Sequence, residues 1–274
     1  MTTGSQSFIL KDMNDPQFMI QSLGERNKVD RLAAFFEAYP LQVRVSTEQH
    51  ENWPATSALH LLPGDKGEVE SVVLSVRGRV AEPRALMTAE VCFGGAGNPL
   101  LNTLPDSLAV PICDARPALR DTVRAFLAEA EAARCGHRHA LDRLGEVIAL
   151  MALRAAIEGG AARPCLLAGL AHPQLAPVLV AIHEAPAHHW SIEEMAQIAG
   201  MSRSRFMAVF PEVVGTTPMA YLTRWRLQLG QRELRKGGAK VKMVARRSGF
   251  ASAEAFSRAY TKEYGRAPAE DARG

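Results

Sequence analysis

The pattern AQIAGMSRSRFMAVFPEVVGTTP at residues 196–218 recurs as ARRSGFASAEAFSRAYTKEYGRAP at residues 245–268. In both copies an alanine precedes a glycine by four residues. From the next serine onward, two aromatic residues, a glycine and a proline follow at identical intervals of four, four, five and three residues. Such self-similarity at a separation of about 50 residues predicts a supersecondary unit that is present twice.

Each copy predicts a helix, a tight turn and a second helix. Gly200 and Gly249 favour the left-handed backbone that ends a helix. Ser202 and Ser252 are candidate N-caps of the helix that follows. The aromatic residues after each serine are four positions apart, so they share one helix face and should pack inward. A helix-turn-helix unit of this kind places the outer face of its second helix in the major groove of DNA.

The residues on these outer faces are candidate base contacts. They are Arg203, Ser204, Met207 and Ala208 in the first copy, and Ala253, Glu254, Ser257 and Arg258 in the second. Arg258 is the strongest candidate because arginine can bond the edge of guanine in bidentate fashion. Met207 and Ala208 offer only apolar contacts, so we expect the second copy to discriminate bases more strongly. Pro211 lies inside the first of these helices, and we expect it to kink or shorten that helix because proline lacks an amide hydrogen.

Between the copies, the segment TPMAYLTRWRLQLGQRELRK at residues 217–236 predicts one long helix. Thr217 suits its N-cap and Pro218 its first turn. About 19 residues at 1.5 Å each give a rod of roughly 28 Å, and one turn of B-DNA is about 34 Å. The rod is therefore long enough to hold two recognition helices in successive major-groove segments. The candidate phosphate contacts around it are Arg205, Arg224, Arg226, Lys240, Lys242 and Arg246.

From about residue 172 onward the chain resembles the AraC family of bacterial transcription regulators. The resemblance rests on the paired units, the aromatic-rich joining helix, the Gly249-Phe250 step, the FSRAY run at residues 256–260 and the closing GRAP at residues 265–268. The chain departs from the family at Pro211 and at Ala255, where a histidine is usual. The resemblance implies sequence-specific binding of double-stranded promoter DNA, a homodimer, and contact with RNA polymerase where the protein activates.

The upstream half predicts an α+β organisation. Residues 41–97 contain short segments rich in β-branched residues, separated by glycine and proline, and resemble the cupin-like sensory domain of many family members. Residues 117–158 return to helical periodicity with a break at Gly136, which predicts a helical pair that covers the sheet or forms the dimer. The expected divisions are 1–114 (β-rich regulatory domain), 115–158 (helical pair), 159–171 (linker) and 172–274 (DNA-binding domain).

Composition and charge agree with two globular domains. Hydrophobic residues make up 47% of the chain and charged residues 22%. Residues 172–274 hold 15 Lys and Arg against 9 Asp and Glu, whereas residues 1–171 hold 17 against 20. The positive half is therefore the half with the repeat, as phosphate binding requires. No signal peptide and no apolar run of about 18 residues is present, so we expect a cytoplasmic, nucleoid-associated protein.

The chain offers little for catalysis or metal binding. His50 and His60 are isolated, and Cys135, His137 and His139 lack a fourth ligand, so we expect no metal, no cofactor and no enzyme activity. By resemblance to oxidant-responsive family members, Cys92 is a redox candidate, alone or with Cys113 or Cys135. The other interpretation is that Cys92 is a buried small hydrophobic residue. The sequence therefore leaves three possibilities for the effector: a small molecule, an oxidant, or no effector at all.

Three alternative functions from other classes each have a distinguishing test. A cupin-type enzyme or a DNA-repair alkyl acceptor would be recognised by metal analysis and thiol alkylation. A non-specific architectural DNA-binding protein would bind random duplexes as well as a promoter fragment. A protein-interaction module would retard no DNA in a gel at low salt.

Overall fold

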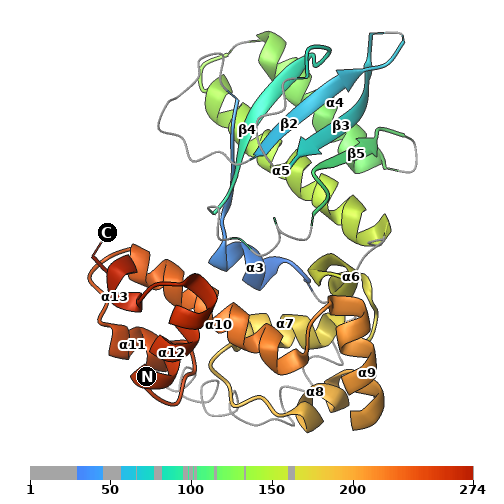
Figure 1. Ribbon diagram of the computed structural model, residues 1–274. Helices are drawn as coiled ribbons and strands as arrows, with labels where there is room; N and C mark the ends of the chain where they lie inside the picture. The colour runs from blue at the N-terminus through green and yellow to red at the C-terminus, as the bar shows by residue number, and fades with distance from the viewer. Residues whose placement is uncertain are drawn as a thin grey trace, which may run out of the picture. The chain divides into compact units, whose positions relative to one another are not determined.

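The computed structural model describes residues 30–45, 57–65, 67–76, 82–94, 98, 101, 104–113, 116–132, 134–159 and 164–273 (Figure 1). The chain divides into two compact units. One comprises Phe35–Ala171 with Val213–Gly215, and the other comprises Met1–Ala34, His172–Glu212 and Thr216–Gly274. The first unit contains strands and helices, whereas the described part of the second is helical, so the predicted α+β class is confirmed.

The first unit is built on a five-stranded antiparallel sheet with the order β1-β4-β2-β3-β5. The strands are β1 (Leu41–Arg44), β2 (Ser57–Pro63), β3 (Val69–Ser75), β4 (Met87–Phe93) and β5 (Ser107–Pro111). The last four residues of β3 and the last three of β4 are buried without alternation, so both faces of the sheet are covered there. The short helix α3 (Ala33–Ala38) precedes the sheet.

Two helices pack beside this sheet (Figure 1): α4 (Pro117–Ala132) and α5 (His137–Gly159), with Gly136 in a left-handed turn (φ 84°) between them. Helix α5 lies against the strands, and α4 packs on α5. A Cβ atom at Gly145 of α5 would lie 2.7 Å from Cγ1 of Val43 on β1, so a side chain there has no room. The predicted helical pair therefore exists, and α5 covers the sheet.

Helical periodicity predicts that Leu141, Leu144, Ile148 and Met151 form the buried stripe of α5. Leu141 and Ile148 are buried, whereas Leu144 and Met151 are only half-buried. The rest of the buried face consists of the small residues Gly145, Ala149 and Ala152, followed by Leu153 and Ile157. Small residues face inward because the helix approaches the sheet closely. Beyond α5, the segment expected to be a linker contains the short helix α6 (Leu166–Ala171).

The second unit holds two helix-turn-helix pairs joined by one long helix, as predicted. Its helices are α7 (Ala176–Glu184), α8 (Ile192–Ile198), α9 (Arg203–Val214), α10 (Pro218–Arg235), α11 (Val241–Arg247), α12 (Ala253–Tyr264) and α13 (Pro268–Asp271). The first pair is α8–α9 and the second is α11–α12, with α10 between them (Figure 1). Among the described residues, no helix is both long and apolar enough to cross a membrane.

Pro211 does not shorten the first recognition helix, so that part of the expectation is wrong. Helix α9 has 12 residues, the same number as α12, and continues three residues past the proline. Phe210, directly before Pro211, is fully buried. Burial of this ring stabilises the helix although proline supplies no amide hydrogen.

Candidate nucleic-acid interface

The two recognition helices, α9 and α12, begin in the same way. Gly200 (φ 61°) and Gly249 (φ 76°) have left-handed backbones in the turns before them. Ser202 Oγ then accepts a hydrogen bond from the amide of Arg205 at 3.3 Å. Ser252 Oγ accepts one from the amide of Ala255 at 3.1 Å. Each cap satisfies an amide that has no partner within the helix, so α9 and α12 start at equivalent residues of the two copies.

The aromatic residues of both helices form the inner faces. Phe206 and Phe210 of α9 have no exposed surface, and their ring centroids are 5.5 Å apart. Phe256 and Tyr260 of α12 are equally buried, with centroids 5.4 Å apart. Because a helix has 3.6 residues per turn, burial of this face directs the positions between the aromatic residues outward.

The candidate base contacts lie on the outward faces. All four on α9 are exposed, and on α12 Glu254 and Arg258 are exposed while Ala253 and Ser257 are half-buried. Arg203 shares an ion pair with Glu193 of α8, with 2.8 Å between Nε and Oε1, and both side chains are 67% exposed. An exposed pair of this kind is worth little, so Arg203 remains accessible to a ligand.

Glu254 gives the outer face of α12 a fixed negative charge. A hydrogen bond from the Ser252 side chain is the main cause that lowers the pKa of Glu254, and the positive charges of Arg258 and Lys242 lower it further. The carboxylate can accept a hydrogen bond but cannot donate one. In a major groove it would suit the N4 amino group of cytosine.

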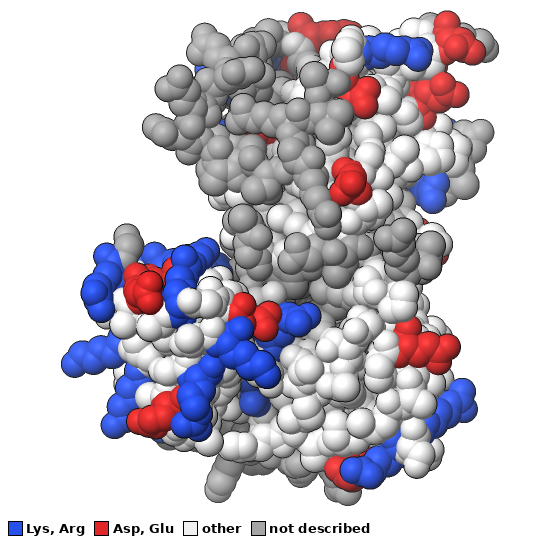
Figure 2. All heavy atoms as spheres, in the orientation of Figure 1, with Lys and Arg blue, Asp and Glu red and all other residues white. Residues whose placement is uncertain are grey.

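Four of the six candidate phosphate contacts, Arg205, Lys240, Lys242 and Arg246, are exposed. Arg224 is also exposed but pairs with Glu263 of α12, with 3.0 Å between Nε and Oε1. Figure 2 shows Lys and Arg atoms gathered over the part of the second unit that contains α11, α12 and α13. The positive charge that the sequence places in residues 172–274 is thus concentrated near the second recognition helix.

Arg226, the sixth candidate, is engaged within the fold. Its Nε donates to the carbonyl oxygen of Pro186 at 2.6 Å, and its Nη2 donates to the carbonyl oxygen of His188 at 2.7 Å. Burial lowers the pKa of this guanidinium group. Two of its donor atoms are used to hold the loop after α7, so Arg226 serves the structure of the unit.

The same loop contacts the turn of the second helix-turn-helix pair. A Cβ atom at Gly249 would lie 2.6 Å from Cα of Ala187 and 3.1 Å from Cζ of Arg226. The loop therefore lies directly against both α10 and the α11–α12 turn. The two helix-turn-helix pairs are joined by α10 and also packed together through this loop, a contact between segments about 40 to 60 residues apart that periodicity could not reveal.

Helix α10 is continuous over its 18 residues, which corresponds to about 27 Å. Thr217 Oγ1 accepts a hydrogen bond from the amide of Ala220 at 3.4 Å and caps its start. Near its other end, a Cβ atom at Gly230 would lie 2.8 Å from Cε2 of Phe256, so the aromatic face of α12 rests directly on the backbone of α10. The rod supports both recognition helices without an interruption.

His183 of α7 anchors the first half of α10, which sequence analysis did not foresee. Its Nε2 lies 2.5 Å from the Tyr221 hydroxyl, and its ring lies 4.3 Å from that of Trp225, centroid to centroid. Burial lowers the pKa of His183 to about 3, so the imidazole is neutral near pH 7. It acts as a polar core residue. Its position on the apolar face of a helix was the only signal available in the sequence.

The described histidines and cysteines of the first unit differ in their exposure to solvent. His60 is buried, with 3.0 Å between its Nδ1 and the Thr88 hydroxyl, and His50 lies outside the described residues. Cys92 is 4% exposed, whereas Cys113 and Cys135 are exposed. In the part of the chain that the structure describes, no three His, Cys, Asp or Glu side chains are grouped as a metal site.

Comparison with known proteins identifies both parts of the chain. A helix-turn-helix domain model of the AraC type matches residues 195–274, and a cupin model matches residues 38–158. An AraC-like protein from Streptomyces antibioticus is 42% identical over 104 residues, which are 38% of this chain and 34% of that protein. The RCS-specific HTH-type transcriptional activator RclR of Escherichia coli is 39% identical over 105 residues, 38% of this chain and 37% of that protein.

A third relative, the HTH-type transcriptional regulator AlkR of Acinetobacter baylyi, is 30% identical over 175 residues. The match covers 63% of this chain and 57% of that protein. The chain thus spans between about a third and just over half of the length of these relatives. RclR and AlkR are both named as regulators of transcription rather than as enzymes.

Proposed function

This chain belongs to the AraC family of transcription regulators that carry a cupin domain, and we propose that it regulates transcription by binding a specific sequence of double-stranded DNA. One observation carries the proposal. Two helices with equivalent starts, α9 and α12, expose their outer faces from a single helical unit that is held together by a continuous rod. A rod of about 27 Å is of the same order as the ~34 Å between successive major-groove segments on one side of a duplex.

The two recognition helices would contribute unequally to specificity. Arg258 and Glu254 of α12 are exposed and ionised, and they complement guanine and the amino group of cytosine, respectively. On α9, Arg203 and Ser204 offer hydrogen bonds, whereas Met207 and Ala208 offer apolar contacts that suit thymine methyl groups. We therefore expect the half of the DNA site that contacts α12 to be the more strictly defined half.

Phosphate contacts would come from the exposed basic residues that the fold leaves accessible. These are Arg205, Arg224, Lys240, Lys242 and Arg246. Each neutralised phosphate releases counterions, so binding should weaken steeply as salt concentration rises. Arg226 is excluded from this set because its donor atoms bind the carbonyl groups of Pro186 and His188.

The cupin unit would control this activity in response to a signal. The burial of Cys92 gives no support to direct oxidation of that thiol, because a reactive cysteine needs solvent access. A homodimer, and contact with RNA polymerase where the protein activates, belong to the same proposal.

The test is selection of binding sites from random duplex DNA by the full chain, followed by gel retardation at a fixed salt concentration. The proposal expects a motif with two parts, one helical turn apart, bound at least about 1,000-fold more tightly than random DNA. Retardation of all duplexes with similar affinity would indicate an architectural protein. No retardation even at low salt would indicate that the helix-turn-helix pairs bind protein instead.

A further inference from the structure

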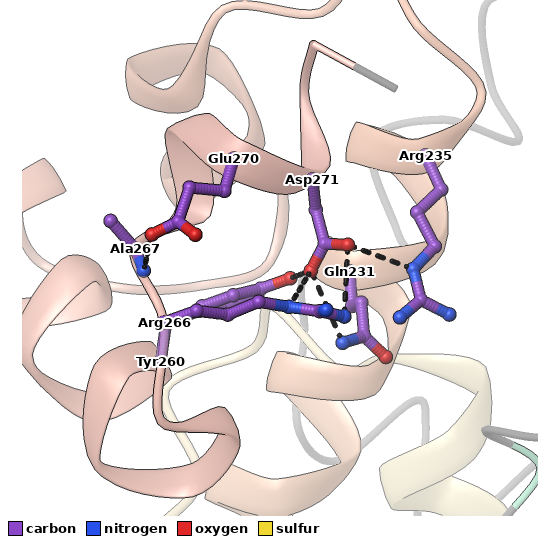
Figure 3. Close-up of polar contacts among 7 residues, drawn as sticks. All are labelled: Gln231, Arg235, Tyr260, Arg266, Ala267, Glu270 and Asp271. Carbon is purple, nitrogen blue, oxygen red and sulfur yellow. Dashed lines mark hydrogen bonds and ion pairs between the residues drawn. The ribbon is translucent and has the colours of Figure 1, made fainter.

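The carboxylate of Asp271 gathers four side chains at the C-terminal end of the second unit (Figure 3). Arg235 of α10 donates from Nε to Oδ1 at 3.0 Å, and Gln231 donates from Nε2 to Oδ2 at 3.4 Å. Arg266, in the turn after α12, reaches both oxygens at 3.0 Å. The hydroxyl of Tyr260 on α12 donates to Oδ2. One carboxylate thus ties α13 to α10, to α12 and to the turn that follows α12.

These contacts compensate for the burial of a charge. The Asp271 side chain is only 9% exposed, and an isolated carboxylate at such a position would be costly. Burial alone would raise the pKa of Asp271, but hydrogen bonds from Tyr260 and Arg235 and the charges of Arg235 and Arg266 together lower it. Asp271 is therefore ionised, and its contacts to the two guanidinium groups are charge-assisted and strong.

Tyr260 connects this cluster to the recognition helix. Its ring is fully buried on the inner face of α12 and contacts the rings of Phe256 and Tyr264, with centroids 5.4 and 4.6 Å apart. Phe256 in turn rests on Gly230 of α10. A hydrophobic face by itself permits small rotations and translations. The directed hydrogen bond from Tyr260 to Asp271 adds the constraint that fixes α12 along and about its own axis.

We infer that Asp271 is a positioning residue for base recognition by α12. Asp271 holds α12, the second recognition helix, in register on the rod and so sets the specificity of half of the DNA site. This inference rests on the proposed function. Its chemical basis is that hydrogen bonds to base edges depend steeply on donor–acceptor distance and angle. A shift of α12 by a fraction of an ångström to one ångström would weaken contacts from Arg258, on the opposite face, without touching α9.

The experiment compares motifs that the full chain selects from random duplex DNA. The variants are Asp271→Asn, which removes the charge at constant shape, and Tyr260→Phe, which removes one hydroxyl and keeps the buried ring. Glu270→Gln is the matched control, because it removes the same charge one residue away, where the Glu270 carboxylate accepts a hydrogen bond from the exposed amide of Ala267 (2.8 Å). Arg258→Ala identifies which part of the motif α12 contacts. Thermal melting of each variant sets a temperature at which all are folded.

We expect Asp271→Asn and Tyr260→Phe to lose sequence preference only in the part of the motif that α12 contacts. The ratio of specific to non-specific affinity should fall about tenfold, which is the size of one lost base contact. Glu270→Gln should keep the wild-type motif. The inference is overturned if Asp271→Asn selects the same motif as Glu270→Gln, or if its affinity changes equally for all sequences, which would be a simple charge effect. A wild-type protein that selects no motif would instead overturn the proposed function.

Discussion

Arg226 on the central rod donates to the carbonyl oxygen of Pro186 at 2.6 Å, although the two residues are 40 positions apart. The contact holds the loop after α7 in a place where it also touches Gly249, in the turn of the second helix-turn-helix pair. The two recognition helices are therefore parts of one packed unit, and their spacing is fixed both by the length of α10 and by this loop.

Gly249→Ala should destabilise the protein more than Gly200→Ala does. Both glycines have left-handed backbones, so both substitutions carry a conformational cost of about 1 kcal/mol. At Gly200 a new Cβ atom meets nothing within 4 Å, whereas at Gly249 it would lie 2.6 Å from Cα of Ala187. We expect Gly249→Ala to lower the free energy of unfolding by a further ~1–3 kcal/mol, measured by urea denaturation. Equal losses at the two positions would show that the loop does not pack against this turn.

Gly230→Ala should also destabilise, although it lies within a helix. Helix propensity alone would make alanine more stable than glycine by about 1 kcal/mol. The new Cβ atom would lie 2.8 Å from Cε2 of Phe256 and 3.2 Å from Oγ of Ser248. The close packing of α10 against α12 should outweigh the propensity gain, with a net loss of ~1–2 kcal/mol in urea denaturation. A net gain in stability would mean that α12 lies farther from the rod than the structure places it.

Arg258→Ala should affect specificity, and Lys240→Ala should affect affinity. If Arg258 bonds a guanine edge, its loss should cost roughly 1–3 kcal/mol at one base pair and relax the preference there. Lys240 is exposed at the start of α11, and its loss should weaken all duplexes alike and reduce the salt slope by about 1. Gel retardation on single-base variants of the selected site, at several salt concentrations, separates the two outcomes. A uniform loss for Arg258→Ala would reassign that residue to a phosphate.

Lowering the pH should reduce the free energy of unfolding, because His183 is buried in its neutral state. Burial lowers the pKa of His183 from 6.5 to about 3. Between these values the unfolded chain binds a proton that the folded chain does not. The stability that His183 contributes is therefore fully present above about pH 6.5 and is lost as pH falls, by at most ~1.4 kcal/mol per pH unit.

The measurement is the free energy of unfolding of wild type and His183→Gln between about pH 7.5 and 5. The wild type should lose stability more steeply than the variant as the pH falls. His189→Gln is the matched control, because it removes another histidine of the same unit, one whose side chain is exposed. If the free energies of unfolding of wild type and His183→Gln fell in parallel, His183 would bind a proton as readily in the folded protein as in the unfolded chain.

Features that depend on neighbouring residues could be predicted from the sequence. The two copies of the repeat predicted both helix-turn-helix pairs, because glycine at a left-handed turn and aromatic residues at helical spacing act locally. The polar and apolar pattern of residues 217–236 predicted α10 within one residue at each end. The segments of residues 41–97 that are rich in β-branched residues predicted strands but not their order, because pairing in a sheet joins distant segments.

The sequence by itself determined the helices of the two repeated units and the helix between them, where they begin and which faces carry the candidate base contacts. Caps, turns and helical periodicity depend on residues only a few positions apart. Only the tertiary structure decided that α5 turns its small residues to the sheet, that Arg226 serves the fold and that Asp271 joins four side chains. The physical reason is that these outcomes depend on how closely two backbones approach. That distance is set by the packing of the whole unit, in which residues 40 positions apart become neighbours.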